Sequence, residues 1–189
     1  MEQKINHVFK AQLAYKYIIR NNNAAERIAK LKALKSAIKQ YEANIYLALQ
    51  SDLRKSNFES AVTELLFIYG EIDYAIKNLG RWMTAKKIGK TLSNPFAKNR
   101  IYYEPKGVCL IIAPWNYPFQ LTVMPLIAAL AAGNTVIVKP SELTPQTSEL
   151  MKKMCQDCFS GSDVILETGE KEKTTELLAY PMDHVFFTG

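Results

Sequence analysis

A side-chain amide held between two prolines is the first group in this sequence that could take part in a reaction. Residues 113–118 read Ala-Pro-Trp-Asn-Tyr-Pro, and Pro114 and Pro118 restrict the backbone on either side of Asn116. An amide N–H fixed in one direction can donate to an oxygen that becomes negative during a reaction. The alternative is that Asn116 only satisfies backbone groups of the turn, and the motif alone leaves both interpretations open.

A cation and a carboxylate lie close together in the motif Lys139-Pro140-Ser141-Glu142, which follows the apolar run Thr135–Val138. In an open α/β sheet, ligands bind beyond the carboxyl ends of the strands, so Lys139 and Glu142 could hold the ribose hydroxyls of a nucleotide. Taken alone, the two residues could equally form a surface ion pair that contributes little to stability.

Gly189 follows another apolar run, Val185–Phe187. A glycine between a strand and a helix is how a pyrophosphate approaches a helix N-terminus. No helical sequence follows Gly189 here, and the fingerprint G-x-G-x-x-G is absent from the sequence. We therefore expect the sheet to lack its last covering helix, as in a domain cut short at its C-terminal end.

The three cysteines offer little chemistry. An odd and sparse set argues against a disulfide scaffold, and together with the polar first residues it predicts a cytoplasmic protein. Cys155-x-x-Cys158 has half the spacing of a zinc motif, but a second pair is missing and both histidines lie far away, so we expect no metal site. Cys109 falls inside an apolar strand, where a thiol is buried and inert.

After Gly107, apolar runs alternate with helical segments. Unbroken apolar strands indicate burial on both faces, which is typical of parallel sheets, so this part predicts a partial doubly wound α/β fold. The expected strands are Val108–Ala113, Thr135–Val138, Val164–Leu166 and Val185–Phe187, and the expected helices are Phe119–Ala132, Pro145–Cys158 and Glu170–Ala179.

The first part of the chain predicts helices. One apolar stripe lies between Asn23 and Ser51, and Ser56 or Asn57 can cap the helix that carries the next one. The second stripe comprises Val62, Leu65, Leu66, Tyr69, Ile72, Ile76 and Leu79. We expect a helical segment over 1–83, an extended connection over 84–106 with a strand at Ile101–Tyr103, and a partial nucleotide-binding domain over 107–189.

Charge and hydropathy argue against a nucleic-acid partner and against a transmembrane segment. The net charge is +6, but lysines such as Lys32, Lys35 and Lys39 lie on one helix face without interleaved aromatic residues, so we expect no nucleic-acid partner. Residues 107–138 carry no charge, yet prolines interrupt them, which favours a buried strand–turn–helix–strand over a transmembrane segment.

Three motifs, GVCLIIAPWNYPF at 107–119, AAGNTVIVKPSE at 131–142 and DHVFFTG at 183–189, occur in an order that resembles the aldehyde dehydrogenase superfamily. The WNYPF form and the helical lead-in resemble its class 3, or fatty-aldehyde, branch most. The resemblance implies an atypical Rossmann-like fold and the oxidation of an aldehyde to a carboxylic acid with NAD or NADP. It also implies that the full-length protein is a homodimer, with residues 100–104 in an oligomerisation hairpin.

Site roles follow from the same resemblance. Asn116 would be the oxyanion-hole amide, Lys139 and Glu142 would hold the adenosine ribose, and Gly189 would open the turn that receives the pyrophosphate. The residues that would line the nicotinamide side of the cleft are Ile112, Ala113, Pro114 and Trp115. Glu142 favours a free ribose hydroxyl and therefore NAD, with NADP left open.

Members of this superfamily are more than twice as long as this chain, and their nucleophilic cysteine and glutamate base lie beyond the motif at 183–189. We therefore expect an N-terminal part of the enzyme that is inactive by itself. One alternative is a non-catalytic module that binds nucleotide or pairs with full-length subunits. Another alternative is a related acyl-phosphate or acyl-CoA reductase. The motif WNYP followed by KPSE favours an aldehyde dehydrogenase over such a reductase.

Overall fold

The N-terminal part of the chain folds into helices, as its apolar periodicity predicts. The computed structural model describes residues 2–89, 92–93 and 96–189. The helices are α1 (Glu2–Ile19), α2 (Ala24–Leu53), α3 (Asn57–Ser60) and α4 (Leu66–Trp82), with a π-helical turn, η1 (Ala61–Leu65), between α3 and α4.

Local capping explains where two of these helices begin. The Asn23 side chain accepts from the Glu26 N–H at 3.1 Å, and the Glu26 carboxylate accepts from the Asn23 N–H at 2.7 Å, which forms a capping box at the start of α2. Ser56 caps α3 by accepting from the Glu59 N–H at 3.1 Å. The expected break before Ala24 and one of the two expected caps are thus confirmed.

A four-stranded parallel sheet forms the C-terminal part, in the order β5-β4-β3-β6. Its strands are β3 (Val108–Ile112), β4 (Thr135–Lys139), β5 (Val164–Leu166) and β6 (His184–Phe187), connected by α5 (Pro118–Ala132), α6 (Pro145–Cys158) and α7 (Lys171–Leu178). Gly133 ends α5 in the left-handed region, at φ 85°, as a C-terminal glycine does.

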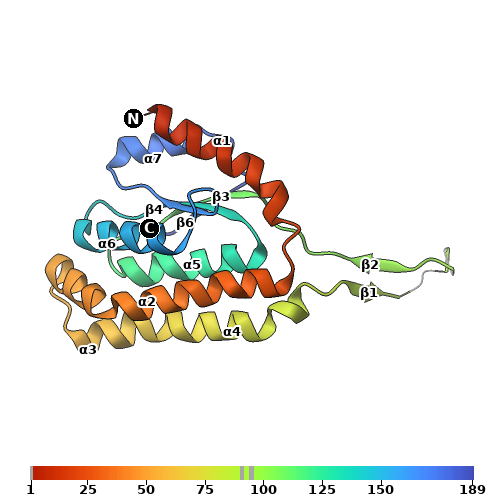
Figure 1. Ribbon diagram of the computed structural model, residues 1–189, viewed down its shortest axis with the longest axis horizontal. Coiled ribbons are helices and arrows are strands. Elements are labelled where there is room, and N and C mark those ends of the chain that lie inside the picture. Colours follow the sequence, from red (N-terminus) through yellow and green to blue (C-terminus); the bar gives the residue numbers. More distant parts are fainter. Residues whose placement is uncertain (1, 90–91, 94–95) are drawn as a thin grey trace.

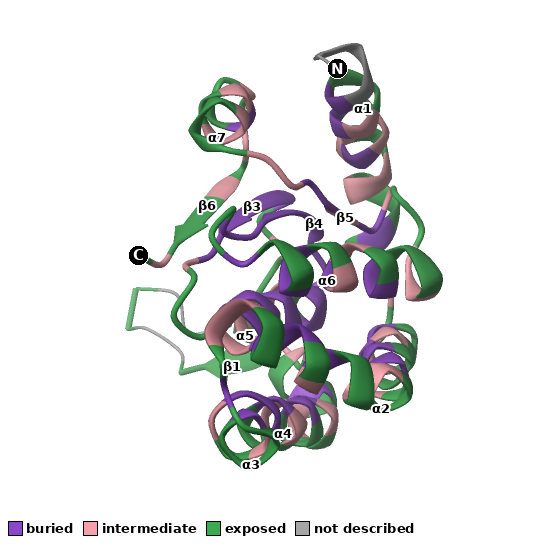
Figure 2. Cartoon of the chain, turned by 90° about the vertical axis from the view of Figure 1, so that its left-hand side faces the viewer, coloured by how far each residue is buried: buried purple, intermediate pink, exposed green. Residues whose placement is uncertain are grey.

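Helices cover both faces of this sheet, so the predicted α/β fold is confirmed (Figure 1). On one face, α2, α4, α5 and α6 pack into a single large apolar core that includes Ile111, Val136 and Val138 of the sheet. On the other face, Ile5 and Phe9 of α1 and Leu177 of α7 pack against the opposite side chains of β3 and β4. Figure 2 shows the buried residues concentrated along β3, β4 and the inner sides of the helices.

Two burial predictions are wrong. Val62 and Leu66 are exposed, because the i→i−5 geometry of η1 shifts the buried face of the helix: Leu65 of the predicted stripe stays buried, and Ile68 joins it. β6 is also not buried on both faces: from Val185 to Phe187 its side chains are exposed, since β6 is an edge strand of the sheet.

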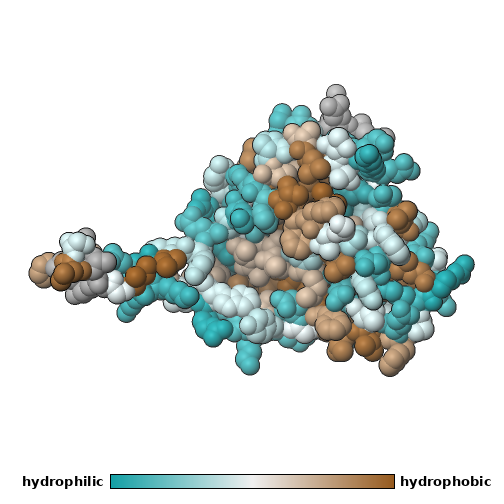
Figure 3. Space-filling model, turned by 180° about the vertical axis from the view of Figure 1, so that it is seen from behind, coloured by the Kyte–Doolittle hydropathy of each residue, from teal (hydrophilic) through white to brown (hydrophobic). Residues whose placement is uncertain are grey.

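The connection over 84–106 is more regular than expected. β1 (Lys86–Ile88) pairs antiparallel with β2 (Asn99–Ile101), so the strand expected at Ile101–Tyr103 begins and ends two residues earlier. The two strands form an arm that projects from the body of the molecule (Figure 1). Apolar side chains are exposed along the arm (Figure 3), among them Ile88, Leu92, Phe96 and Ile101.

Two further findings concern the described residues only. None of their helices is long and apolar enough to cross a membrane. Nor do their His, Cys, Asp and Glu side chains gather in any group of three or more that could hold a metal ion.

Candidate functional site

The carboxyl ends of three neighbouring strands meet at one edge of the sheet. Ile112 of β3 lies opposite both Lys139 of β4 and Phe187 of β6. Beyond the paired residues, the Ala113 N–H donates to the Lys139 carbonyl at 3.1 Å and the Thr188 N–H donates to the Ile112 carbonyl at 3.1 Å. The segments that carry the predicted site residues therefore leave the sheet side by side.

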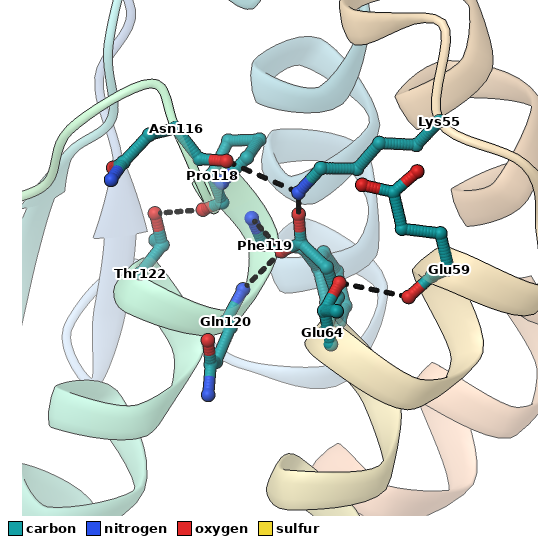
Figure 4. A network of polar contacts seen from close by, with 9 residues as sticks. Lys55, Glu59, Glu64, Asn116, Pro118, Phe119, Gln120 and Thr122 are labelled. Atoms are coloured by element: carbon teal, nitrogen blue, oxygen red, sulfur yellow. Dashed lines mark hydrogen bonds and ion pairs between the residues drawn. The ribbon is translucent and has the colours of Figure 1, made fainter.

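The Asn116 turn connects β3 to α5. Ile112 and Ala113 are buried, Pro114 is half-buried, and Trp115 and Asn116 are exposed. The backbone carbonyl of Asn116 accepts from Lys55 Nζ at 3.1 Å, and Figure 4 shows its side-chain amide pointing away from Lys55.

Asn116 makes no side-chain hydrogen bond within the part of the chain that the structure describes. The amide therefore does not satisfy backbone groups of its own turn, and its donors are available to a ligand.

Lys139 and Glu142 form an ion pair at the end of β4. The Lys139 side chain is 3% exposed, and its Nζ lies 2.6 Å from Glu142 Oε2, whose side chain is 42% exposed. The hydrogen bond from Lys139 lowers the pKa of the Glu142 carboxyl. A buried ammonium thus holds an ionised carboxylate that is accessible to solvent. Because Lys139 is buried, the pair differs from the exposed surface ion pair that was the alternative from the sequence.

Gly189 lies beside the turn after β3. Its φ of 148° favours glycine, and a Cβ built on it would lie 3.7 Å from the Cβ of Pro114. The residues that follow β3 and β6 therefore lie close together. At this position the family resemblance implies a turn that receives the pyrophosphate.

The cysteines lie in inert surroundings. Cys109 is buried in β3 and Cys155 in α6, while Cys158 is half-buried one helical turn after Cys155. Burial raises the pKa of the Cys109 thiol to about 11 and that of the Cys158 thiol to about 12, and it also raises the pKa of Cys155. All three thiols are therefore protonated at neutral pH, as the sequence predicts for Cys109.

Two charged residues at the site were missed by the sequence analysis. Lys55 lies between α2 and α3, and Glu64 lies in η1; both are buried. Lys55 contacts the Asn116 turn, and Glu64 contacts the first residues of α5 directly after it (Figure 4). They are 61 and 52 residues away from Asn116 in the sequence, and no local pattern marks a charged side chain that will be buried by a distant turn.

A cavity of about 690 Å³ lies elsewhere, between α4, α5 and the base of the arm. Arg27, Leu79, Trp82 and Tyr103 are among its lining residues, and the eight predicted site residues are not. The predicted site thus lies at the carboxyl edge of the sheet, apart from this cavity.

A parallel sheet with helices on both faces, and polar side chains gathered at its carboxyl edge, defines a class of α/β protein that binds its ligand at that edge. The chain belongs to the aldehyde dehydrogenase family, whose model matches residues 2–189.

The relatives that match this chain are much longer than it is. AldX of Bacillus subtilis is 42% identical over an alignment of 193 positions that covers 100% of this chain and 43% of AldX. Aldehyde dehydrogenase family 3 member A2 of Pongo abelii is 42% identical over 86% of this chain and 34% of its own length. A solved structure of the substrate-bound state of Staphylococcus aureus AldH matches with a TM-score of 0.95 at 40% identity, over 98% of this chain and 40% of that one. This chain thus spans between 34% and 43% of the length of these three proteins.

Proposed function

We propose that this chain serves the oxidation of an aldehyde to a carboxylic acid with NAD or NADP, and that it supplies the oxyanion-binding amide and one wall of the cofactor cleft. Residues 107–189 would form the first part of the nucleotide-binding domain. The observation that carries the proposal is the meeting of the Asn116 turn, the Lys139–Glu142 pair and Gly189 at one sheet edge.

The residues at this edge fit a dinucleotide. Glu142 is ionised and accessible, so its oxygens can accept from two ribose hydroxyls, while the Lys139 ammonium retains donors beyond the one that Glu142 uses. An acidic residue at this position favours a free hydroxyl over a phosphate, which supports NAD. The apolar segment 112–115 would border the nicotinamide. When bound, the cofactor accepts a hydride from the substrate carbon.

Asn116 would stabilise the charge that develops on the aldehyde oxygen. Its amide N–H groups lack partners in the described part of the chain and lie on a turn held by prolines on both sides. A donor that is oriented before the reaction needs no reorganisation when the oxyanion forms, and removing one such donor typically lowers kcat by about 100- to 1,000-fold.

The nucleophile would come from outside this chain. The reaction calls for a thiolate that attacks the aldehyde carbon, and the thiols of Cys109, Cys155 and Cys158 are held in their neutral form by burial. The chain also spans only 34–43% of the first relatives named above, so those proteins have ample further sequence to provide the nucleophile and a general base. We therefore propose that the 189-residue chain alone does not turn over aldehyde.

A fusion of residues 1–189 to the part of AldX that follows its matched segment tests this function. The fusion should reduce NAD⁺ in the presence of an aldehyde, and Asn116→Ala should lower its kcat by about 100-fold or more. The isolated chain should show no turnover. A folded fusion without activity, or turnover by the isolated chain, would contradict the proposal.

The exposed arm favours a second candidate function, pairing with other subunits. Ile88 and Ile101 of the arm are 49% and 42% exposed, and apolar strands exposed in this way commonly pair with a partner. For the complete protein we propose a homodimer that uses this arm. Co-purification of the tagged chain with a full-length homologue, lost on Ile88→Lys and Ile101→Lys, tests the pairing; absence of the homologue from the purified material would contradict it.

A further inference from the structure

Glu64 is a carboxylate without any exposure to solvent, at 0%. Its Oε2 accepts from the backbone N–H groups of Phe119 at 3.0 Å and Gln120 at 2.8 Å, and its Oε1 lies 2.5 Å from Lys55 Nζ (Figure 4). A buried charge is costly unless it is paired and hydrogen-bonded, and this carboxylate is both.

Glu64 caps α5 from a different helix. α5 begins at Pro118, and Tyr117, the residue at its N-cap position, provides no side-chain hydrogen bond. The first free N–H groups of the helix thus receive their acceptor from η1, and the negative charge of Glu64 also lies favourably at the positive end of the helix dipole. The start of α5, directly after the Asn116 turn, depends on this contact.

Lys55 contacts the turn itself. Its ammonium donates to the backbone carbonyl of Asn116 at 3.1 Å and lies 4.1 Å from the ring centroid of Tyr117, in addition to its contact with Glu64. With the carbonyl of Asn116 held on the Lys55 side, its side chain leaves the backbone on the opposite side, as Figure 4 shows. Lys55 thus holds the end of the turn, and Glu64 holds the first turn of the helix that follows it.

Unusual backbone geometry brings both residues to this position. Arg54, directly before Lys55, has a φ of 60°, the only positive φ outside glycine in the described residues. Glu64 lies in η1, where the Leu66 N–H donates to the Ala61 carbonyl across five residues. Left-handed residues and π-helical turns are both costly in backbone energy, and π-turns are frequent at functional sites.

We propose that Lys55 and Glu64 are positioning residues that aim the Asn116 amide at the reacting oxygen. They would touch neither substrate nor cofactor. Lys55 holds the backbone carbonyl of Asn116, Glu64 holds the first free N–H groups of α5, and a buried ion pair joins the two side chains. This inference rests on the function proposed above, because it assigns a purpose to the direction of Asn116.

Hydrogen exchange of the 189-residue chain tests, without any assay of activity, whether the Lys55–Glu64 pair holds the start of α5. Glu64→Gln should speed exchange of the Phe119 and Gln120 amides by about tenfold or more, since each loses a charged acceptor. The control is Asp73→Asn, which breaks the exposed Lys35–Asp73 ion pair between α2 and α4 and should leave these amides unchanged. Equal exchange in Glu64→Gln and the unmodified chain would overturn the proposal.

Kinetics of the AldX fusion test the direction of the amide. Lys55→Met combined with Glu64→Gln removes both charges at once, so no uncompensated charge is left buried and the fusion should fold. Its kcat should fall by roughly tenfold to 100-fold with little change in the KM for NAD⁺, because the lost interaction acts at the transition state. Asp73→Asn should retain full kcat.

The two experiments separate the two proposals. An unchanged kcat in the folded double variant would overturn the positioning role while leaving the proposed function intact. An inactive but folded unmodified fusion would contradict the proposed function, and the exchange rates would then decide by themselves whether the pair holds the turn.

Discussion

A donor stabilises an oxyanion only when its direction is fixed and its hydrogens are not already engaged. Asn116 meets the second condition, because its amide has no partner among the described residues. Asn134 is the opposite case: its Oδ1 accepts from the Gly107 N–H at 2.9 Å and its Nδ2 donates to the Ala129 carbonyl at 3.3 Å. Asn134 thus has a structural role that Asn116 does not have.

The two asparagines therefore predict different effects on stability. Asn116→Ala should change the free energy of unfolding by less than about 0.5 kcal/mol, as expected for an exposed residue. Asn134→Ala should lower it by about 1–3 kcal/mol, because it leaves the buried Gly107 N–H without an acceptor. Urea denaturation of both variants measures the difference. Equal losses would mean that Asn116 also serves the fold.

Asp183 predicts an acid-sensitive link between three elements. It pairs with Lys16 of α1 at 2.8 Å and accepts from the Val108 N–H at 2.7 Å. Burial opposes its ionised form, but the hydrogen bonds from Lys16 and Val108 prevail and lower the pKa of Asp183 below the ordinary value of 3.8. Its contribution to stability is therefore complete above the ordinary value and is lost as pH falls through the lower folded-state pKa.

Thermal unfolding between pH 2 and pH 6 should show this contribution as a loss of stability at the acid end, relative to Asp183→Asn. The variant should be less stable than the unmodified chain near pH 6 and should approach it near pH 2. A constant difference over the whole range would contradict the assignment.

Among the secondary-structure elements, α5 and α6 follow the turns that carry Asn116 and Glu142. Both helices take their N-terminal caps from the helical lead-in, which comprises α1 to α4 and η1. Glu64 caps α5, and Asp52 at the end of α2 accepts from the Gln146 N–H at 3.2 Å and the Thr147 N–H at 2.8 Å at the start of α6. Neither Tyr117 nor Thr144, the residues at the two N-cap positions, provides a side-chain cap. The lead-in thus orients the turns that carry the proposed site.

Sequence reasoning predicted the elements better than their contacts. Regular periods and glycine or proline boundaries depend on neighbouring residues, so α2, α5, α6 and the strands β3 to β5 were predicted to within a residue or two. The π-turn, the β1 strand and the burial of Lys55 depend on tertiary packing, which leaves no local pattern. The candidate site residues were named from motifs and from the family resemblance, and the structure brings the strand ends that carry them together as the parallel sheet predicts.

The turn before β3 provides a prediction at this scale. Gly107 has a φ of 131°, and a Cβ added there would lie 2.2 Å from Asp183 Oδ2, so Gly107→Ala should destabilise the chain by more than about 1 kcal/mol. Gly70 in α4 has open space around it, and Gly70→Ala should stabilise the chain by roughly 0.5–1 kcal/mol through the higher helix propensity of alanine. Chemical denaturation that gives both variants the same sign would contradict the account.

In the molecule as a whole, β5 and β6 are the two edge strands of the sheet, and β6 is the more exposed of the two. β6 has β3 on one side, and the side chains from Val185 to Phe187 are 41–66% exposed. An uncovered apolar edge strand offers unpaired N–H and C=O groups to another chain.

We therefore predict that the isolated chain self-associates at micromolar concentrations through β6. Val185→Lys should shift it toward monomer, because a charge on an edge strand opposes pairing. Leu47→Lys, at an exposed apolar position on α2, is the matched control and should have no such effect. Sedimentation velocity of the three proteins provides the measurement; a monomeric unmodified chain would argue against an open edge.

We propose above that the Asn116 turn, the Lys139–Glu142 pair and Gly189 face one nucleotide-binding edge. Titration of the ¹⁵N-labelled chain with NAD⁺ tests it most directly, with the backbone amide signals reporting where the ligand lies. We expect the signals of Ala113, Asn116, Glu142 and Gly189 to shift together, and Glu142→Gln should weaken these shifts. Shifts confined to other parts of the chain, or none at saturating NAD⁺, would contradict it.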